Sequence, residues 1–116
     1  MTAPDAGNGP VDLTALAADL LDRAAAAGAR RAAVTLAHPI DGLRQTVIAL
    51  LAGVDLGEHE SPGPATLQVL RGRVRWVRRR CRTAPGPGEI APLPMQRHGL
   101  HAEEDSVVLL SVAIDV

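Results

Sequence analysis

The stretch GVDLGEHES at residues 53–61, followed by TLQVLRG at residues 66–72, carries the most informative pattern in the chain. In it, Gly53 precedes His59 by six positions, and a Pro-Gly turn separates the histidine from the second segment. The second segment is a β-like run that ends at Gly72, and a glycine there allows the bend that a small barrel needs. The pattern therefore predicts short strands joined by glycine-containing turns.

The rest of the chain divides into one helix and a series of short strands. Asp12 is a suitable N-cap for a helix that extends to about Ala27, and its apolar stripe should pack on the outside of a sheet or on another subunit. Gly28 is a natural stop, after which the period becomes strand-like. Short strands with Gly/Pro turns favour an all-β sandwich or barrel. The expected strands are 31–37, 43–51, 66–70, 73–77, 81–84, 89–93, 98–102 and 106–114, with a hairpin tip at 78–80.

The chain has 116 residues, which suits one domain with a modest core. We divide it into a disordered tail at 1–10, an N-terminal helix at 11–28 and a barrel at 29–116. Phe and Tyr are absent and Trp76 is the only aromatic residue, so Leu, Val, Ile and Ala must build the core.

The charge pattern bears on partners and on location. The formal net charge is −1, which gives no overall field toward nucleic acid or an anionic membrane. Seven arginines lie between Arg71 and Arg82, but no aromatic residues suited to base stacking interleave with them, so we expect a solvated strand face. No apolar stretch reaches the ~18 residues of a spanning helix, and no secretory signal is visible. With Cys81 as the single cysteine, these features favour a cytoplasmic protein.

The opening stretch resembles the first metal-binding motif of the cupin family. That motif runs from a glycine through a histidine-x-histidine pair and a glutamate to a second glycine. Gly53, His59 and Gly72 match it without a gap. Two ligand positions do not match, because Ser61 stands at the second histidine and Ala65 at the glutamate.

Residues 88–98 resemble the second cupin motif, which places a glycine turn, a short strand and a proline before a ligand histidine. Gly88, Pro94 and His98 match, whereas Ala102 stands at the asparagine of that motif. The two half-motifs occur in the right order, and the resemblance covers about residues 43–115.

The resemblance implies an all-β fold, a cupin-type double-stranded jelly-roll barrel preceded here by an N-terminal α-helix. It also implies a homodimer, and a site inside the barrel. Cupins typically hold a divalent metal (Zn, Ni, Mn or Fe) there, and His59 and His98 match the metal-ligand positions.

Two imidazoles alone fall short of the three protein ligands usual for catalytic zinc. Strand parity places Gln68 and His101 on the face opposite to the ligand positions, whereas Glu60 lies next to the motif turn and could swing in. Without metal, His59 or His98 could act as a general acid or base, with Glu60 as an orienting carboxylate. The candidate third donors are His101, Gln68, Glu58 and Glu60.

These features predict a small cupin-domain protein of bacterial small-molecule metabolism that binds a small ligand in the barrel near His59 and His98. One alternative is a metal-dependent cupin enzyme of dioxygenase, isomerase or cyclase type. A second is a structural dimerisation domain with a filled interior. The expected lining of the ligand pocket is Val47, Leu67, Val69, Val74 and Trp76.

Overall fold

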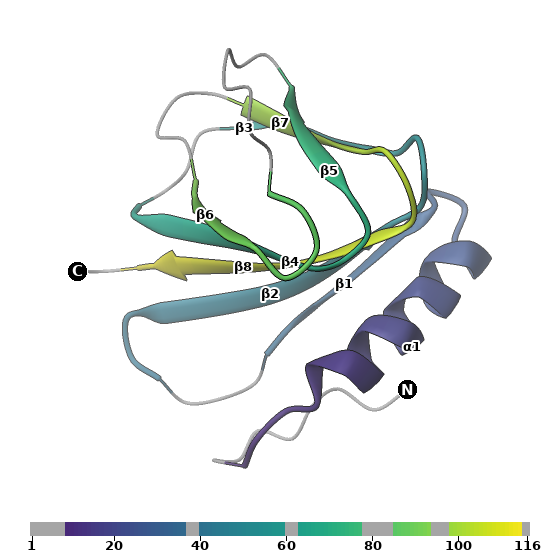
Figure 1. Ribbon diagram of the computed structural model, residues 1–116. Helices are drawn as coiled ribbons and strands as arrows, with labels where there is room; N and C mark the ends of the chain where they lie inside the picture. The colour runs from purple at the N-terminus through teal and green to yellow at the C-terminus, as the bar shows by residue number, and fades with distance from the viewer. Residues whose placement is uncertain (1–8, 37–39, 60–62, 78–84, 94–97, 115–116) are drawn as a thin grey trace.

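The computed structural model describes residues 9–36, 40–59, 63–77, 85–93 and 98–114. Within these ranges the chain forms one helix and a set of antiparallel strands (Figure 1). Their bounds are α1 Leu13–Ala26, β1 Arg31–Thr35, β2 Leu43–Leu50, β3 Asp55–His59, β4 Ala65–Arg71, β5 Val74–Val77, β6 Ile90–Pro92, β7 His98–Ala102 and β8 Ser106–Ala113.

Helix α1 begins and ends where the sequence predicted, to within one residue. The Asp12 carboxylate accepts a hydrogen bond from the Ala15 N–H at 3.1 Å, which satisfies one of the free donors of the first turn. At the other end, Ala27 adopts an extended conformation and donates to the Ala24 carbonyl. Within the described part of the chain, no helix is both long and apolar enough to cross a membrane.

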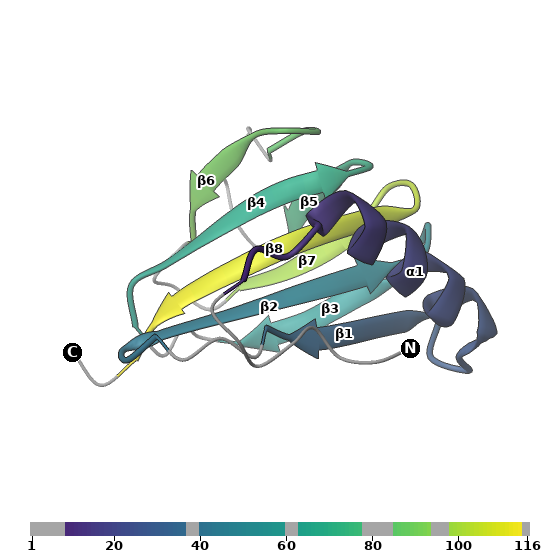
Figure 2. The same cartoon turned by 90° about the horizontal axis from the view of Figure 1, so that it is seen from below.

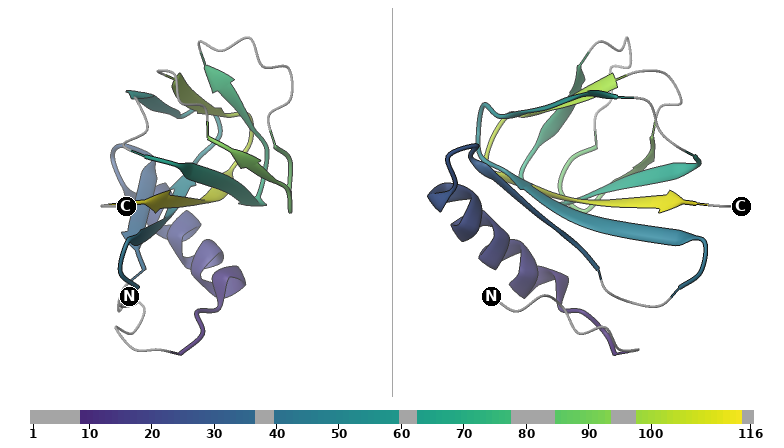
Figure 3. Two further views of the ribbon diagram at one scale, coloured as in Figure 1. Left: turned by 90° about the vertical axis from the view of Figure 1, so that its left-hand side faces the viewer. Right: turned by 180° about the vertical axis from the view of Figure 1, so that it is seen from behind.

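The strands form two antiparallel sheets. A five-stranded sheet, here the large sheet, has the order β1-β2-β8-β4-β6, and a three-stranded sheet, the small sheet, has the order β3-β7-β5. Seen from below, α1 lies along one face of the large sheet (Figure 2). From behind, the small sheet lies on the opposite face (Figure 3). The apolar stripe of α1 therefore packs on the outside of a sheet, the first of the two predicted arrangements.

This layering gives the molecule two apolar cores, one on each face of the large sheet. Successive residues of β8 and of the second half of β2, from Val47 to Leu50, alternate between them, so these stretches form nearly continuous apolar runs rather than alternating patterns. The helix-side core contains Leu16, Ala17, Leu20, Ala24, Leu36, Val47, Ala49, Leu51, Val107 and Leu109. The barrel-side core contains Ile48, Leu50, Leu67, Val69, Val74, Trp76, Leu93, Leu100, Ala102 and Val108.

The strand prediction missed one strand of the small sheet. β3 was expected only as part of a motif, because Gly57 and the charged residues around it break the apolar alternation that marks a strand. The predicted strand at 81–84 and the hairpin tip at 78–80 lie outside the described residues, as does most of the predicted tail. The division into tail, helix and barrel stays a prediction.

The bend predicted at Gly72 is confirmed, and the structure shows why a glycine stands there. Gly72 has φ of 82°. A Cβ added at this position would collide with the Ser106 hydroxyl and the Asp105 carbonyl, and it would lie only 2.7 Å from the Cα of Ser106. The Ser106 side chain is fully buried. Its hydroxyl accepts from the Arg73 N–H at 3.0 Å and donates to the Glu104 carbonyl at 2.7 Å. The start of β8 is thereby fastened to the β4–β5 bend.

We predict that Gly72→Ala destabilises the protein far more than Gly88→Ala. Gly88 is a matched control, because its φ is 80° and a Cβ there meets nothing within 4 Å. The control should lose about 1–2 kcal/mol for the left-handed backbone alone. Gly72→Ala should lose about 1–3 kcal/mol more, because the added methyl overpacks against Ser106. Urea unfolding followed by Trp76 fluorescence measures both, and equal losses would contradict the close approach.

Candidate functional site

The two histidines taken from the cupin-like motifs occupy directly opposed positions in the small sheet. His59 is the last residue of β3 and His98 the first of β7, and the two are paired in the antiparallel register. Residues directly opposed in an antiparallel ladder belong to the same face of the sheet and have closely spaced Cβ atoms. The fold therefore brings together two positions that lie far apart in the sequence.

A register shift in β3 produces this pairing. Leu56 is paired with Leu100, and the next pair joins His59 to His98. Three residues along β3 therefore correspond to two residues along β7. In a regular strand, three steps would put position 59 on the face opposite to Leu56. The extra residue of a β-bulge restores the phase. Position 59 thus belongs to the same face as Leu56 and Leu100, the face that looks into the barrel.

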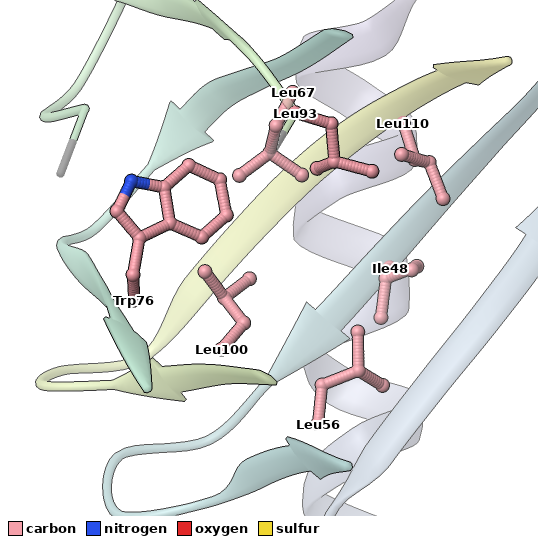
Figure 4. A pocket seen from close by; sticks show the side chains of 7 residues that line it. All are labelled: Ile48, Leu56, Leu67, Trp76, Leu93, Leu100 and Leu110. Atoms are coloured by element: carbon pink, nitrogen blue, oxygen red, sulfur yellow. The ribbon is translucent and has the colours of Figure 1, made fainter. Parts of the chain in front are cut away.

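An apolar cavity lies between the two sheets on this inner face (Figure 4). Its volume is about 20 Å³, close to the ~10–15 Å³ that one water molecule occupies on this measure. Leu56 and Leu100 form part of the wall, and they are the cross-strand pair that precedes His59 and His98 in the ladder. The complete lining is Ile48, Leu56, Leu67, Trp76, Leu93, Leu100 and Leu110.

The residues predicted to line a ligand pocket can be compared with the lining of this cavity. Leu67 and Trp76 line the cavity. Val69 and Val74 are buried in the barrel-side core but are not among the lining residues. Val47 is a correction, because it lies in the helix-side core, and Ile48 is the β2 residue that faces the cavity. The second half of β2, from Val47 to Leu50, is apolar on both faces, so its sequence does not show which set of alternate residues faces the lumen.

The remaining polar candidates lie elsewhere. His101 hydrogen-bonds through Nδ1 to the Asp55 carboxylate, on the strand face opposite to Leu100. Gln68 is paired with Leu109 of the helix-side core, whereas its neighbour Leu67 lines the cavity. Glu58 falls in the bulged part of β3, and Glu60 lies outside the described residues.

Within the described ranges, the donors present do not make up the metal site that the fold implies. Ala65, at the glutamate position of the motif, packs its methyl group against the barrel-side core and offers no donor. In the described ranges, no group of three or more His, Cys, Asp or Glu side chains is placed to hold a metal ion. With imidazoles only at positions 59 and 98, the described ligand positions fall short of the three or four protein ligands usual for zinc.

No family model matches the sequence, and no curated protein sequence matches it. Solved structures do. A protein of unknown function from Streptococcus pyogenes, SPY1581, superposes with a TM-score of 0.68 and 24% identity over 97% of this chain and 95% of its own. A cupin superfamily protein from Desulfitobacterium hafniense DCB-2 gives a TM-score of 0.64 and 17% identity, over 73% of this chain and 78% of its own.

An enzyme is also among the similar structures. Salicylate 1,2-dioxygenase from Pseudaminobacter salicylatoxidans gives a TM-score of 0.70 and 17% identity over 85% of this chain. The match covers only 33% of the dioxygenase.

Two packed antiparallel sheets with this strand order form a double-stranded jelly roll. The chain has the fold of the cupin superfamily, as these likenesses show, and the predicted fold class is confirmed. At such identities the likeness establishes the fold and leaves the chemistry to the residues of this chain.

The register predicts that cysteines at positions 59 and 98 will form a disulfide. Directly opposed strand residues have Cα separations within the ~4.4–6.8 Å range of disulfides. His59→Cys/His98→Cys, made in a Cys81→Ala background, should lose both free thiols on mild oxidation, as measured by maleimide labelling and intact mass. The matched control, His59→Cys/His101→Cys, should keep them, because position 101 is on the other face of β7. Free thiols in the first variant would contradict the bulged register.

Proposed function

We propose that this protein is a non-catalytic cupin-fold module of bacterial, cytoplasmic small-molecule metabolism. It binds a small ligand whose apolar part enters the cavity and whose polar end meets His59 and His98. The observation that carries the proposal is the register, which puts the two histidine positions beside Leu56 and Leu100 of the cavity wall.

The chemistry of the surroundings narrows the ligand class. The cavity is lined by aliphatic side chains and one indole, so it favours an apolar body. Its volume of about 20 Å³ restricts that body to a small group, unless the wall opens around it. Imidazoles titrate near neutral pH and attract an anionic or hydrogen-bonding head. A small monocarboxylic acid combines these properties, and salicylate, which the dioxygenase neighbour is named for, belongs to this class.

The test is a thermal-shift titration with butyrate, benzoate and salicylate. Wild type should be stabilised by at least one of them, because a ligand that binds only the folded state raises its stability. His59→Ala and His98→Ala should lose the shift. The matched control His101→Ala should keep it, because it removes an imidazole from the same strand but from the other face.

Two results would contradict the proposal. Equal thermal shifts in all variants would show that ligand binding does not depend on His59 and His98. Loss of the shift in His101→Ala alone would place the carboxylate on the outer face of the small sheet.

A metal-dependent enzyme is the second candidate, favoured by the opposed histidine positions. Elemental analysis after incubation with Zn, Ni, Mn or Fe(II) decides between the two. Because the described donor set is incomplete, we predict metal well below one equivalent in wild type. Near-stoichiometric metal, lost in His59→Ala and His98→Ala but kept in His101→Ala, would overturn this and favour the enzyme.

The small cavity favours a third candidate, a dimerisation domain with a filled barrel. We propose a homodimer for each of the three candidate functions, so the presence of a dimer does not distinguish between them. Light scattering coupled to size-exclusion chromatography at micromolar concentration tests the dimer itself, and a monomer mass would contradict it. A dimer without any ligand-induced thermal shift would favour the structural role over the binding role.

A further inference from the structure

A row of three charged or titratable side chains crosses the outer face of the small sheet. Asp55 on β3 is paired with His101 on β7, and His101 is paired with Arg75 on β5. The adjacent row of the sheet lines the internal cavity and consists of Leu56, Leu100 and Trp76. Because side chains alternate along a strand, the charged row lies on the opposite, outer face.

The contact between Asp55 and His101 fixes the state of the imidazole. His101 Nδ1 hydrogen-bonds to an Asp55 carboxylate oxygen, which can only accept, so Nδ1 carries the proton. The ring is thereby oriented, and within the described part of the chain Nε2 has no hydrogen-bond partner. The His101 side chain is 24% exposed and that of Asp55 64%, so the pair lies at the surface but the imidazole is partly enclosed.

Arg75 borders the imidazole on the side away from Asp55. Its side chain is exposed, and within the described ranges its guanidinium forms no ion pair. Guanidinium donors match two oxygens of a phosphate or carboxylate at once. The adjoining row contributes Arg73 and Glu103, both exposed and tied by a backbone hydrogen bond of 2.9 Å from the Glu103 N–H to the Arg73 carbonyl.

We propose that Arg75 and His101 form a binding site for the phosphate group of a small phosphate monoester. A phosphate has enough oxygens to meet both groups, Arg75 by charge-assisted hydrogen bonds and His101 through Nε2. A phosphate offers both a P–OH and charged oxygens, so it can donate to an unprotonated Nε2 or accept from a protonated one. Asp55 acts as a positioning residue that holds the ring. This site is independent of the carboxylate-binding function proposed for the barrel interior.

The test is an NMR titration of the full chain with inorganic phosphate, following the His101 ring Cε1–H signal at pH 7. Sulfate at matched ionic strength is the comparison anion, because it has no proton to donate to a neutral Nε2. We expect saturable phosphate shifts in the millimolar range typical of an exposed site, with sulfate binding roughly three- to tenfold more weakly. Equal, non-saturating shifts with both anions would show charge screening only and overturn the proposal.

Variants separate this site from general surface charge. Arg75→Gln should weaken phosphate binding roughly three- to tenfold, because it removes the charged donors. Arg31→Gln is the matched control, since Arg31 is also an exposed strand arginine but lies on β1 of the large sheet, and it should leave the affinity unchanged within about twofold. Both residues are exposed, so neither variant should unfold the protein. Equal effects of the two substitutions would contradict the site.

Asp55→Asn tests the positioning role. It should weaken phosphate binding and also change the ring ¹⁵N chemical shifts of His101, because the imidazole loses the carboxylate that holds the proton on Nδ1. A variant with unchanged affinity would remove Asp55 from the proposal. Unchanged phosphate binding in both Asp55→Asn and Arg75→Gln would contradict the proposed phosphate site as a whole.

Discussion

The large sheet is covered on both faces, by α1 on one side and by the small sheet on the other, and most other features follow from this double burial. β2 and β8 bury successive residues, Val47 to Leu50 and Ser106 to Leu109, so no strand face at the centre meets water. In a chain without Phe or Tyr, this arrangement gives the Leu, Val and Ile side chains two layers in which to be buried. The helix is therefore part of the core rather than an appendage.

The sequence was sufficient for the parts of the fold that depend on local signals. The cap at Asp12, the apolar stripe of α1 and the left-handed bend at Gly72 are each fixed by a few neighbouring residues. The phase of β2 was not predictable in this way, because Val47 and Ile48 are equally apolar and only the packing of the two layers decides which one faces the lumen. β3 was missed because its sequence lacks the apolar alternation of a strand, and it is the pairing with β7 that makes it one.

The candidate site shows the same division. The motif resemblance identified His59 and His98, but counting along the strand places position 59 on the wrong face relative to Leu56. Only the bulge brings it into phase with His98. Bulges depend on the partner strand as much as on the bulged one, so a single sequence does not locate them. Strand parity also predicts that His101 lies on the face opposite to position 98, and His101 does lie opposite to the cavity-lining Leu100, because β7 pairs regularly with β5 from Gly99 to Ala102.

The small sheet links the interior to the outer surface through its central strand. On β7, Leu100 lines the cavity and the next residue, His101, belongs to the charged outer row. β3 and β5 repeat this step with Leu56 beside Asp55 and with Trp76 beside Arg75. The alternation of a strand keeps the charged row in water and the apolar row out of it, which avoids the cost of burying an ion. Three short strands therefore present two chemically different surfaces. Because β7 is paired on both edges, a change in its register would move residues on both surfaces at once.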